Sequence, residues 1–186
     1  MNYVISTSGK GSSANTPRFI EKTNDYMFMR RGEWGPHADY HDLVVNKNGK
    51  DEVIIPADYC KKFSTDEEQC PGIDLGCSKI FAKESSIFVT SLWRNHWAIL
   101  EVNCETKAIK PIAFDSQKST VLLDMDDEGR MLIKESSLVQ APEISLLSGE
   151  NKTLVYEYPK IEDQLEYEQG TLKSTDETGE SFAFHR

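Results

Sequence analysis

The sequence lacks any apolar run long enough to cross a membrane, and its first residues lack the features of a classical secretion signal. No stretch of the 186 residues approaches the ~20 apolar residues that a membrane-spanning helix requires. The opening segment, MNYVISTSGKGSSANT, has no basic region followed by an apolar one. We therefore expect a cytoplasmic protein, or one delivered into a host cell without a classical signal peptide.

Basic residues are also scarce. The chain has 21 lysines and arginines against 31 aspartates and glutamates, which gives a formal net charge of −10. Nucleic acids and anionic membranes attract positive side chains, so neither is predicted as a partner. A basic partner would suit this charge, but the requirements of solubility alone would explain it.

The cysteines contain no pair with the CxxC spacing that is typical of zinc sites. They are Cys60, Cys70, Cys77 and Cys104. In a chain without a secretion signal, they are expected as reduced thiols rather than as a disulfide framework. The sequence therefore predicts no metal site on these cysteines.

The sequence does contain a series of strand signals. β-Branched and aromatic residues are concentrated in short runs bounded by turn residues, and Asn48-Gly49 predicts a tight hairpin. Pro111 lies inside one run and predicts an edge strand or a bulge there. The strand assignments are 3–6, a hairpin within 42–56, 86–93, 96–103, 108–115, a hairpin within 120–135, and 152–158.

Two segments carry helix signals. Residues 16–31 begin with Thr16 in an N-cap position and Pro17 at the first helical position. Residues 56–63 begin with Pro56 and predict one or two turns of helix.

The strands and helices together predict an α+β fold, in which flanking helices cover a central, mostly antiparallel sheet. We expect a core domain over residues 1–142 and an acidic C-terminal segment, partly strand, over 143–186. That segment carries ten acidic residues against four lysines and arginines.

His96 and Asp115 form the first candidate site. If residues 97–103 and 108–114 pair as a hairpin, His96 begins one strand and Asp115 ends its neighbour. Both then lie at the same open end, where a carboxylate can orient an imidazole that acts as a general base. A surface histidine and a turn-forming aspartate are the alternative interpretation.

The segments NHWAILEVN and IKPIAFDSQ resemble the His and Asp core of the ubiquitin-like-protein-specific cysteine protease superfamily, over residues 86–117. That superfamily includes SUMO proteases, the adenovirus protease and effector deubiquitinases. The resemblance implies that His96 is the general base, Asp115 its orienting partner, and Trp97 the neighbouring aromatic. Trp97 and Gln117 are the candidate binding residues, and the polar Gln117 suits the rim of a cleft. No cysteine follows Asp115, so the resemblance implies a truncated or catalytically degenerate relative, or one with another order of residues.

Cys60 is the candidate nucleophile for that other order, which papain-like and transglutaminase-like hydrolases use. It lies within the short helix signal over 56–63 and precedes Lys61 and Lys62. A helix N-terminus and nearby positive charge would favour its thiolate. Cys77 is the next choice, and a buried structural thiol is the alternative for either.

Two further motifs match metal-site templates in part. Residues 124–135 match a calcium loop at Asp124, Asp126, Gly129 and Glu135, but their flanks favour strands, so an acidic hairpin turn is expected. His37 and His41 have the spacing of a zinc pair on a helix, but Pro36 favours a loop.

The sequence thus predicts a cysteine-peptidase-like protein without a cofactor, whose substrate would be a protein such as ubiquitin or a ubiquitin-like modifier. The alternatives are a hydrolase that uses Cys60 and a non-catalytic protein-binding module.

Overall fold

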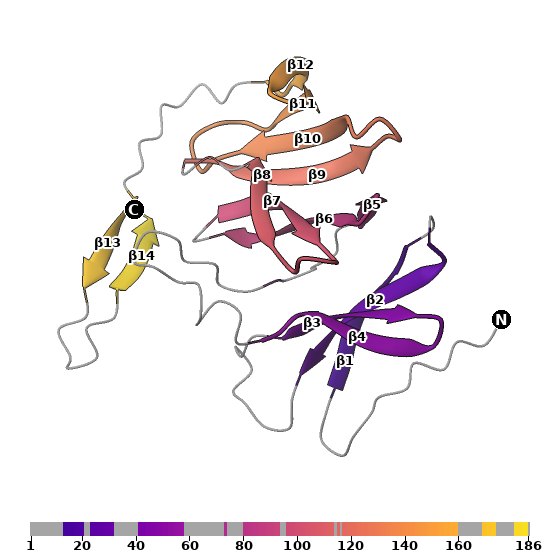
Figure 1. Cartoon of the computed structure of the whole chain (residues 1–186). Coiled ribbons are helices and arrows are strands. Elements are labelled where there is room, and N and C mark those ends of the chain that lie inside the picture. The colour runs from indigo at the N-terminus through magenta and orange to yellow at the C-terminus, as the bar shows by residue number, and fades with distance from the viewer. Residues whose placement is uncertain are drawn as a thin grey trace.

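The computed structural model describes residues 13–20, 23–31, 41–57, 73, 80–93, 96–113, 115, 117–159, 169–173 and 181–185. This part of the chain contains fourteen strands and no helix. The strands form three four-stranded sheets and one two-stranded sheet (Figure 1), and all paired strands are antiparallel. The prediction of an α+β fold with flanking helices is therefore wrong, and the described fold is all-β.

The first sheet contains β1 (Ser13–Ile20), β2 (Asp25–Arg31), β3 (Asp42–Lys47) and β4 (Lys50–Ile55), paired in chain order. The hairpin predicted around Asn48-Gly49 is confirmed as β3–β4. Asn48 and Gly49 have φ angles of 52° and 80°, and a tight two-residue hairpin turn favours positive φ at both positions.

The helix predicted over residues 16–31 is wrong, because this segment forms the β1–β2 hairpin. Thr16 and Pro17 do not begin a helix. They lie at a register shift within the edge strand β1, where Thr16 has a φ of 48° and proline is tolerated. Met27 and Met29 are buried on one face of β2, and Phe28, which lies between them in the sequence, is buried on the other. Pairing of β2 with a distant strand therefore overrides the local helix signal. Of the helix predicted over 56–63, the structure describes only Pro56 and Ala57, which are not helical.

The second sheet contains β5 (Phe81–Lys83), β6 (Ser86–Trp93), β7 (His96–Asn103) and β8 (Ile109–Ala113). The three consecutive strands predicted from residue 86 onward are confirmed as β6, β7 and β8. The prediction from Pro111 is confirmed as well, because β8 is an edge strand and its register with β7 shifts between Ile99 and Leu100.

The third sheet contains β9 (Ser119–Met125), β10 (Met131–Ser136), β11 (Glu143–Ser148) and β12 (Asn151–Glu157). The predicted hairpin within 120–135 is confirmed as β9–β10, and the predicted strand over 152–158 is β12. The division expected between residues 142 and 143 falls between β10 and β11, which pair along their length. β13 (Gln169–Lys173) and β14 (Ser181–His185) form the two-stranded sheet.

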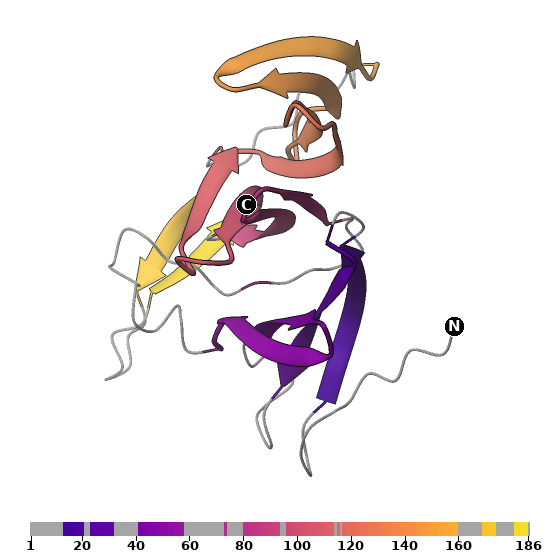
Figure 2. The same ribbon diagram turned by 45° about the vertical axis from the view of Figure 1, so that its right-hand side comes forward.

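The second sheet lies between the first and the third, as both ribbon views show (Figure 1 and Figure 2). Successive residues of a strand point to opposite faces. Along β7, Ala98, Leu100 and Val102 pack with residues of the first sheet, and Ile99 packs with residues of the third. The apolar run in β7 is therefore nearly continuous because both faces of the strand are covered.

We predict that Leu100→Ala and Ile99→Ala each lower the free energy of unfolding by about 2–5 kcal/mol, since each removes a fully buried side chain from a different face of β7. Urea denaturation measures this effect. Leu138→Ala is the control: that side chain is exposed, and its change stays within about 0.5 kcal/mol. Equal effects of all three substitutions would contradict the two-sided core.

Candidate functional site

His96 is the first residue of β7 and is buried, with 6% of its surface exposed. Its cross-strand partner is Trp93, the last residue of β6. Cross-strand partners and alternate residues share a face of a sheet, so His96 lies on the same face as Ala98 and Leu100. The ring therefore lies at the end of the core that joins the first and second sheets.

Asp115 helps to form the turn from β8 into β9. Its backbone forms an isolated bridge with Lys118, and its Oδ1 accepts a hydrogen bond from the Gln117 N–H at 2.8 Å. An aspartate that accepts a bond from the backbone two residues later is a typical turn former. The described geometry thus gives this carboxylate a structural role.

The two residues lie near the same end of the second sheet. Ile99 pairs with Ala113, so extending that register by two residues sets Asp115 level with Trp97, the neighbour of His96. Trp97 is half-buried on the other face, and its backbone N–H donates a hydrogen bond to Ser119 Oγ at 3.4 Å. The catalytic roles of His96 and Asp115 and the binding roles of Trp97 and Gln117 stay predictions.

The thiols give no partner for His96 among the described residues. Cys60 and Cys77 lie outside them, and so does His37. Cys104 is described, but it follows the last residue of β7, about 26 Å along the strand from His96. Burial raises the pKa of its thiol, so it is not an activated nucleophile.

We predict that Cys104 reacts slowly with iodoacetamide at neutral pH, because burial holds its pKa above the ordinary thiol value. Peptide-resolved mass spectrometry of the folded chain, sampled over time and pH, measures its alkylation rate. The same chain unfolded in urea is the control, and its rate should rise at lower pH. A faster reaction in the folded chain at neutral pH would contradict the prediction.

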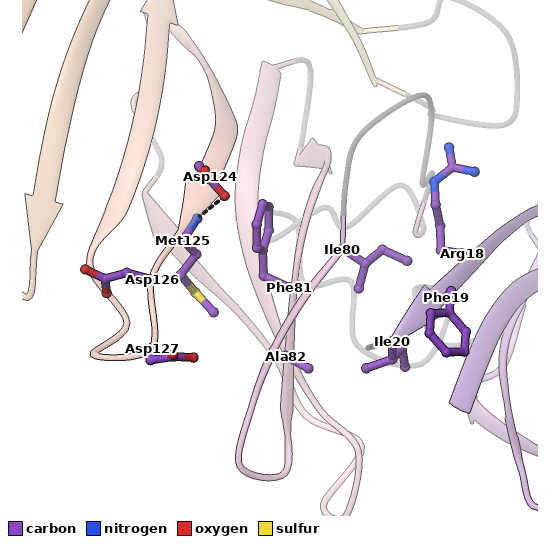
Figure 3. Close-up of a pocket in the computed structure, with 10 residues that line it drawn as sticks. All are labelled: Arg18, Phe19, Ile20, Ile80, Phe81, Ala82, Asp124, Met125, Asp126 and Asp127. Atoms are coloured by element: carbon purple, nitrogen blue, oxygen red, sulfur yellow. Dashed lines mark hydrogen bonds between the residues drawn. The ribbon is translucent and has the colours of Figure 1, made fainter. Parts of the chain in front are cut away.

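A cavity of about 470 Å³ lies where the three larger sheets contribute neighbouring segments, a volume in the range of ligand pockets. Figure 3 shows Asp124, Asp126 and Asp127 on one side of it and Arg18 and Phe19 on the other. Its remaining lining residues are apolar: Ile20, Ile80, Phe81, Ala82 and Met125. Sequence reasoning missed this cavity because it assigned the β1 residues to a helix.

The charged groups around the cavity already have partners within the chain. Arg130 Nε donates to Asp126 Oδ2 at 2.6 Å, and Asp124 Oδ1 accepts a hydrogen bond from the Met125 N–H. Arg18 Nη1 donates to the carbonyl of Pro17 at 2.9 Å. The segment that matches the calcium-loop template is therefore a strand–turn–strand hairpin in which an arginine neutralises a central carboxylate. No cluster of three or more potential metal ligands occurs in the described part of the chain.

We predict that the Asp126 carboxyl titrates below its ordinary range. Desolvation opposes this shift, but the hydrogen bonds and the charge of Arg130 outweigh it and lower the pKa. Because the folded-state pKa is depressed, the stabilisation is present above the unfolded-state pKa and is lost as the pH falls through the folded-state pKa. Carboxyl NMR shifts measured over pH give the midpoint. Arg130→Gln should raise the midpoint, and Lys134→Gln, a control that removes a positive charge from β10, should not. Equal midpoints in all three chains would contradict the assignment.

β12 presents an exposed apolar edge. All seven of its residues are exposed, and Leu154, Val155 and Tyr156 in its middle are 53%, 59% and 51% accessible. Tyr156 also forms an edge-to-face contact with Tyr158, with ring centroids 5.0 Å apart. Both ribbon views show β12 as the outermost strand of the third sheet (Figure 1 and Figure 2). The sequence identified the strand, but its exposure depends on which strands pair.

Comparison with known proteins leaves the family of this chain open. No protein-family model matches the sequence, and no curated protein shows significant similarity to it. Within the residues that the structure describes, no helix could cross a membrane. The function must therefore be inferred from the three features above: the His96 end of the second sheet, the cavity and the β12 edge.

Proposed function

We propose that this chain is a protein-binding module that pairs its edge strand β12 with an extended segment of a partner protein. The observation that carries the proposal is the exposure of β12 along its full length, with three consecutive large apolar or aromatic residues at its centre. An edge strand presents backbone N–H and C=O groups that a partner strand can pair with. The side chains beside them supply apolar contact area.

The other edges of the three larger sheets carry features that discourage such pairing. β1 contains Pro17 and a register shift, β4 begins with Lys50-Asp51-Glu52, and β8 contains Pro111. Proline, charge and irregular register are the usual means by which proteins protect sheet edges.

The two remaining edges are protected in other ways. β5 is only three residues long, and β9 packs against the second sheet. β12 has no proline, and its one lysine lies near an end of the strand. Its apolar centre therefore favours pairing over protection.

The cysteine-peptidase interpretation stays a prediction, and no described contact favours it over binding. An electrophile-tipped ubiquitin or ubiquitin-like probe would test it directly. Labelling of Cys60 or Cys77 that is lost in His96→Ala would support a hydrolase, and absence of labelling in the folded chain would argue against one.

We expect that peptides selected from a random display library bind the chain at β12. Binding of a selected peptide, measured by fluorescence anisotropy, should weaken at least about tenfold in Val155→Lys, because the substitution adds a charge at the centre of the edge. Leu138→Lys is the matched control, since it replaces another exposed apolar residue, which lies in the connection between β10 and β11.

Hydrogen exchange gives a second measurement of the same binding. Amides of residues 151–157 should exchange more slowly when the peptide is bound, because strand addition satisfies them. A monomeric chain from which no peptide can be selected, or equal binding by both variants, would overturn the proposed function.

A further inference from the structure

We propose that the partner at β12 is a second copy of this chain, paired antiparallel about a twofold axis between Leu154 and Val155. This inference rests on the proposed function and names the occupant of the same edge. It is carried by the register of β12 against β11, which makes the outer edge of β12 complementary to itself.

A bulge determines which side chains of β12 share a face. Ser145 pairs with Leu154 and Ile144 pairs with Tyr156, so Val155 is an extra residue between them. Paired residues share a face of the sheet. Leu154 therefore lies on the face of buried Ser145, and Tyr156 lies on the opposite face.

The same register assigns the rest of the strand. Lys152 pairs with Leu147, and Glu157 pairs with Glu143, so both lie on the face of Ser145. Thr153 pairs with Leu146 and shares the opposite face with Tyr156. Lys152 and Glu157, which carry opposite charges, thus point to one side of the sheet from the two ends of the strand.

Antiparallel pairing about the proposed axis brings like faces together at the two outer pairs on each side of the axis. Lys152 lies opposite Glu157 of the second copy, Thr153 opposite Tyr156, and Leu154 opposite Val155. Each pair occurs twice, because a twofold interface is isologous. Opposite charges therefore meet at both ends, and apolar residues meet at the centre.

The bulge also disfavours the neighbouring register. Pairing about an axis through Leu154 would set Lys152 opposite Tyr156, and these two side chains lie on different faces of the sheet. A regular ladder requires partners on one face, so this alternative fails. The register between Leu154 and Val155 keeps the faces matched for Lys152 with Glu157 and for Thr153 with Tyr156.

Lys152 is held on the required face by a contact inside the chain. It forms an ion pair with Glu135, a buried carboxylate on β10. A buried charge needs such a partner, which favours keeping Lys152 in place. In the pair, its ammonium group lies between Glu135 of its own chain and Glu157 of the second copy.

Pairing would join the two third sheets into one continuous sheet of eight strands. Its outer edges would be the two β9 strands, which already pack against the second sheets. The twofold axis closes the assembly at two chains, because the β12 edge is consumed in both. The exposed apolar centre of the strand would then be covered.

Sedimentation velocity of the full chain over a range of concentrations tests the inference. We expect a monomer–dimer equilibrium in the parent chain and in Leu138→Lys, the control that changes an exposed apolar residue outside β12. Val155→Lys should raise the dissociation constant about a hundredfold, one factor of ten for each substituted strand in the pair. A dimer that persists unchanged in Val155→Lys would overturn the inference.

A charge exchange tests the register. In one chain, Lys152→Glu is combined with Glu135→Gln, so that the new carboxylate does not face Glu135. In the other chain, Glu157→Lys is introduced. Each chain alone would place like charges opposite each other and should remain monomeric, whereas their mixture restores both opposite-charge pairs and should form a 1:1 heterodimer. Failure of the mixture to associate, while the parent chain dimerises, would overturn the register.

The outcomes separate this inference from the proposed function. A parent chain that stays monomeric but binds selected peptides through β12 would overturn the second copy as partner and leave the binding module intact. A parent chain that stays monomeric and binds no peptide would overturn both.

Discussion

The burial of the second sheet on both faces is the constraint on which the rest of this structure depends. β6 and β7 carry apolar residues at consecutive positions, so neither face of these strands can be left in water. The first sheet covers one face through residues such as Leu43 and Val45, and the third covers the other through Leu122 and Ile133. The layered order of the three sheets follows from this requirement.

The β3–β4 and β7–β8 hairpins could be predicted because their sequence signals are local. Asn48-Gly49 favours a tight turn wherever it occurs between apolar runs, and Pro111 restricts its strand to an edge. The segment around Thr16-Pro17 could not be assigned in the same way. The same two residues suit a helix start or an irregular edge strand, and only pairing with β2 and β3 decides between them.

The candidate sites also combine features that the sequence could predict with features that it could not. The hairpin register sets His96 and Asp115 near one end of the sheet, which alternation and loop length could predict. The bond from the Gln117 N–H to Asp115 depends on the turn geometry, which the sequence pattern leaves open. The cavity depends on how whole sheets stack, and the exposed β12 edge depends on which strands pair, so no local motif identifies either.

Each of the three larger sheets is a meander whose strands pair in chain order. Strand pairing of this kind closes short loops and has a low entropic cost, whereas stacking the sheets joins distant segments. During synthesis the first sheet can form before the second, but the face of β7 that contains Ile99 has no cover until β9 and β10 are made. A ribosome that pauses before residue 119 would therefore leave the first and second sheets folded with one apolar surface exposed to water. That interval is when the nascent chain most needs a chaperone.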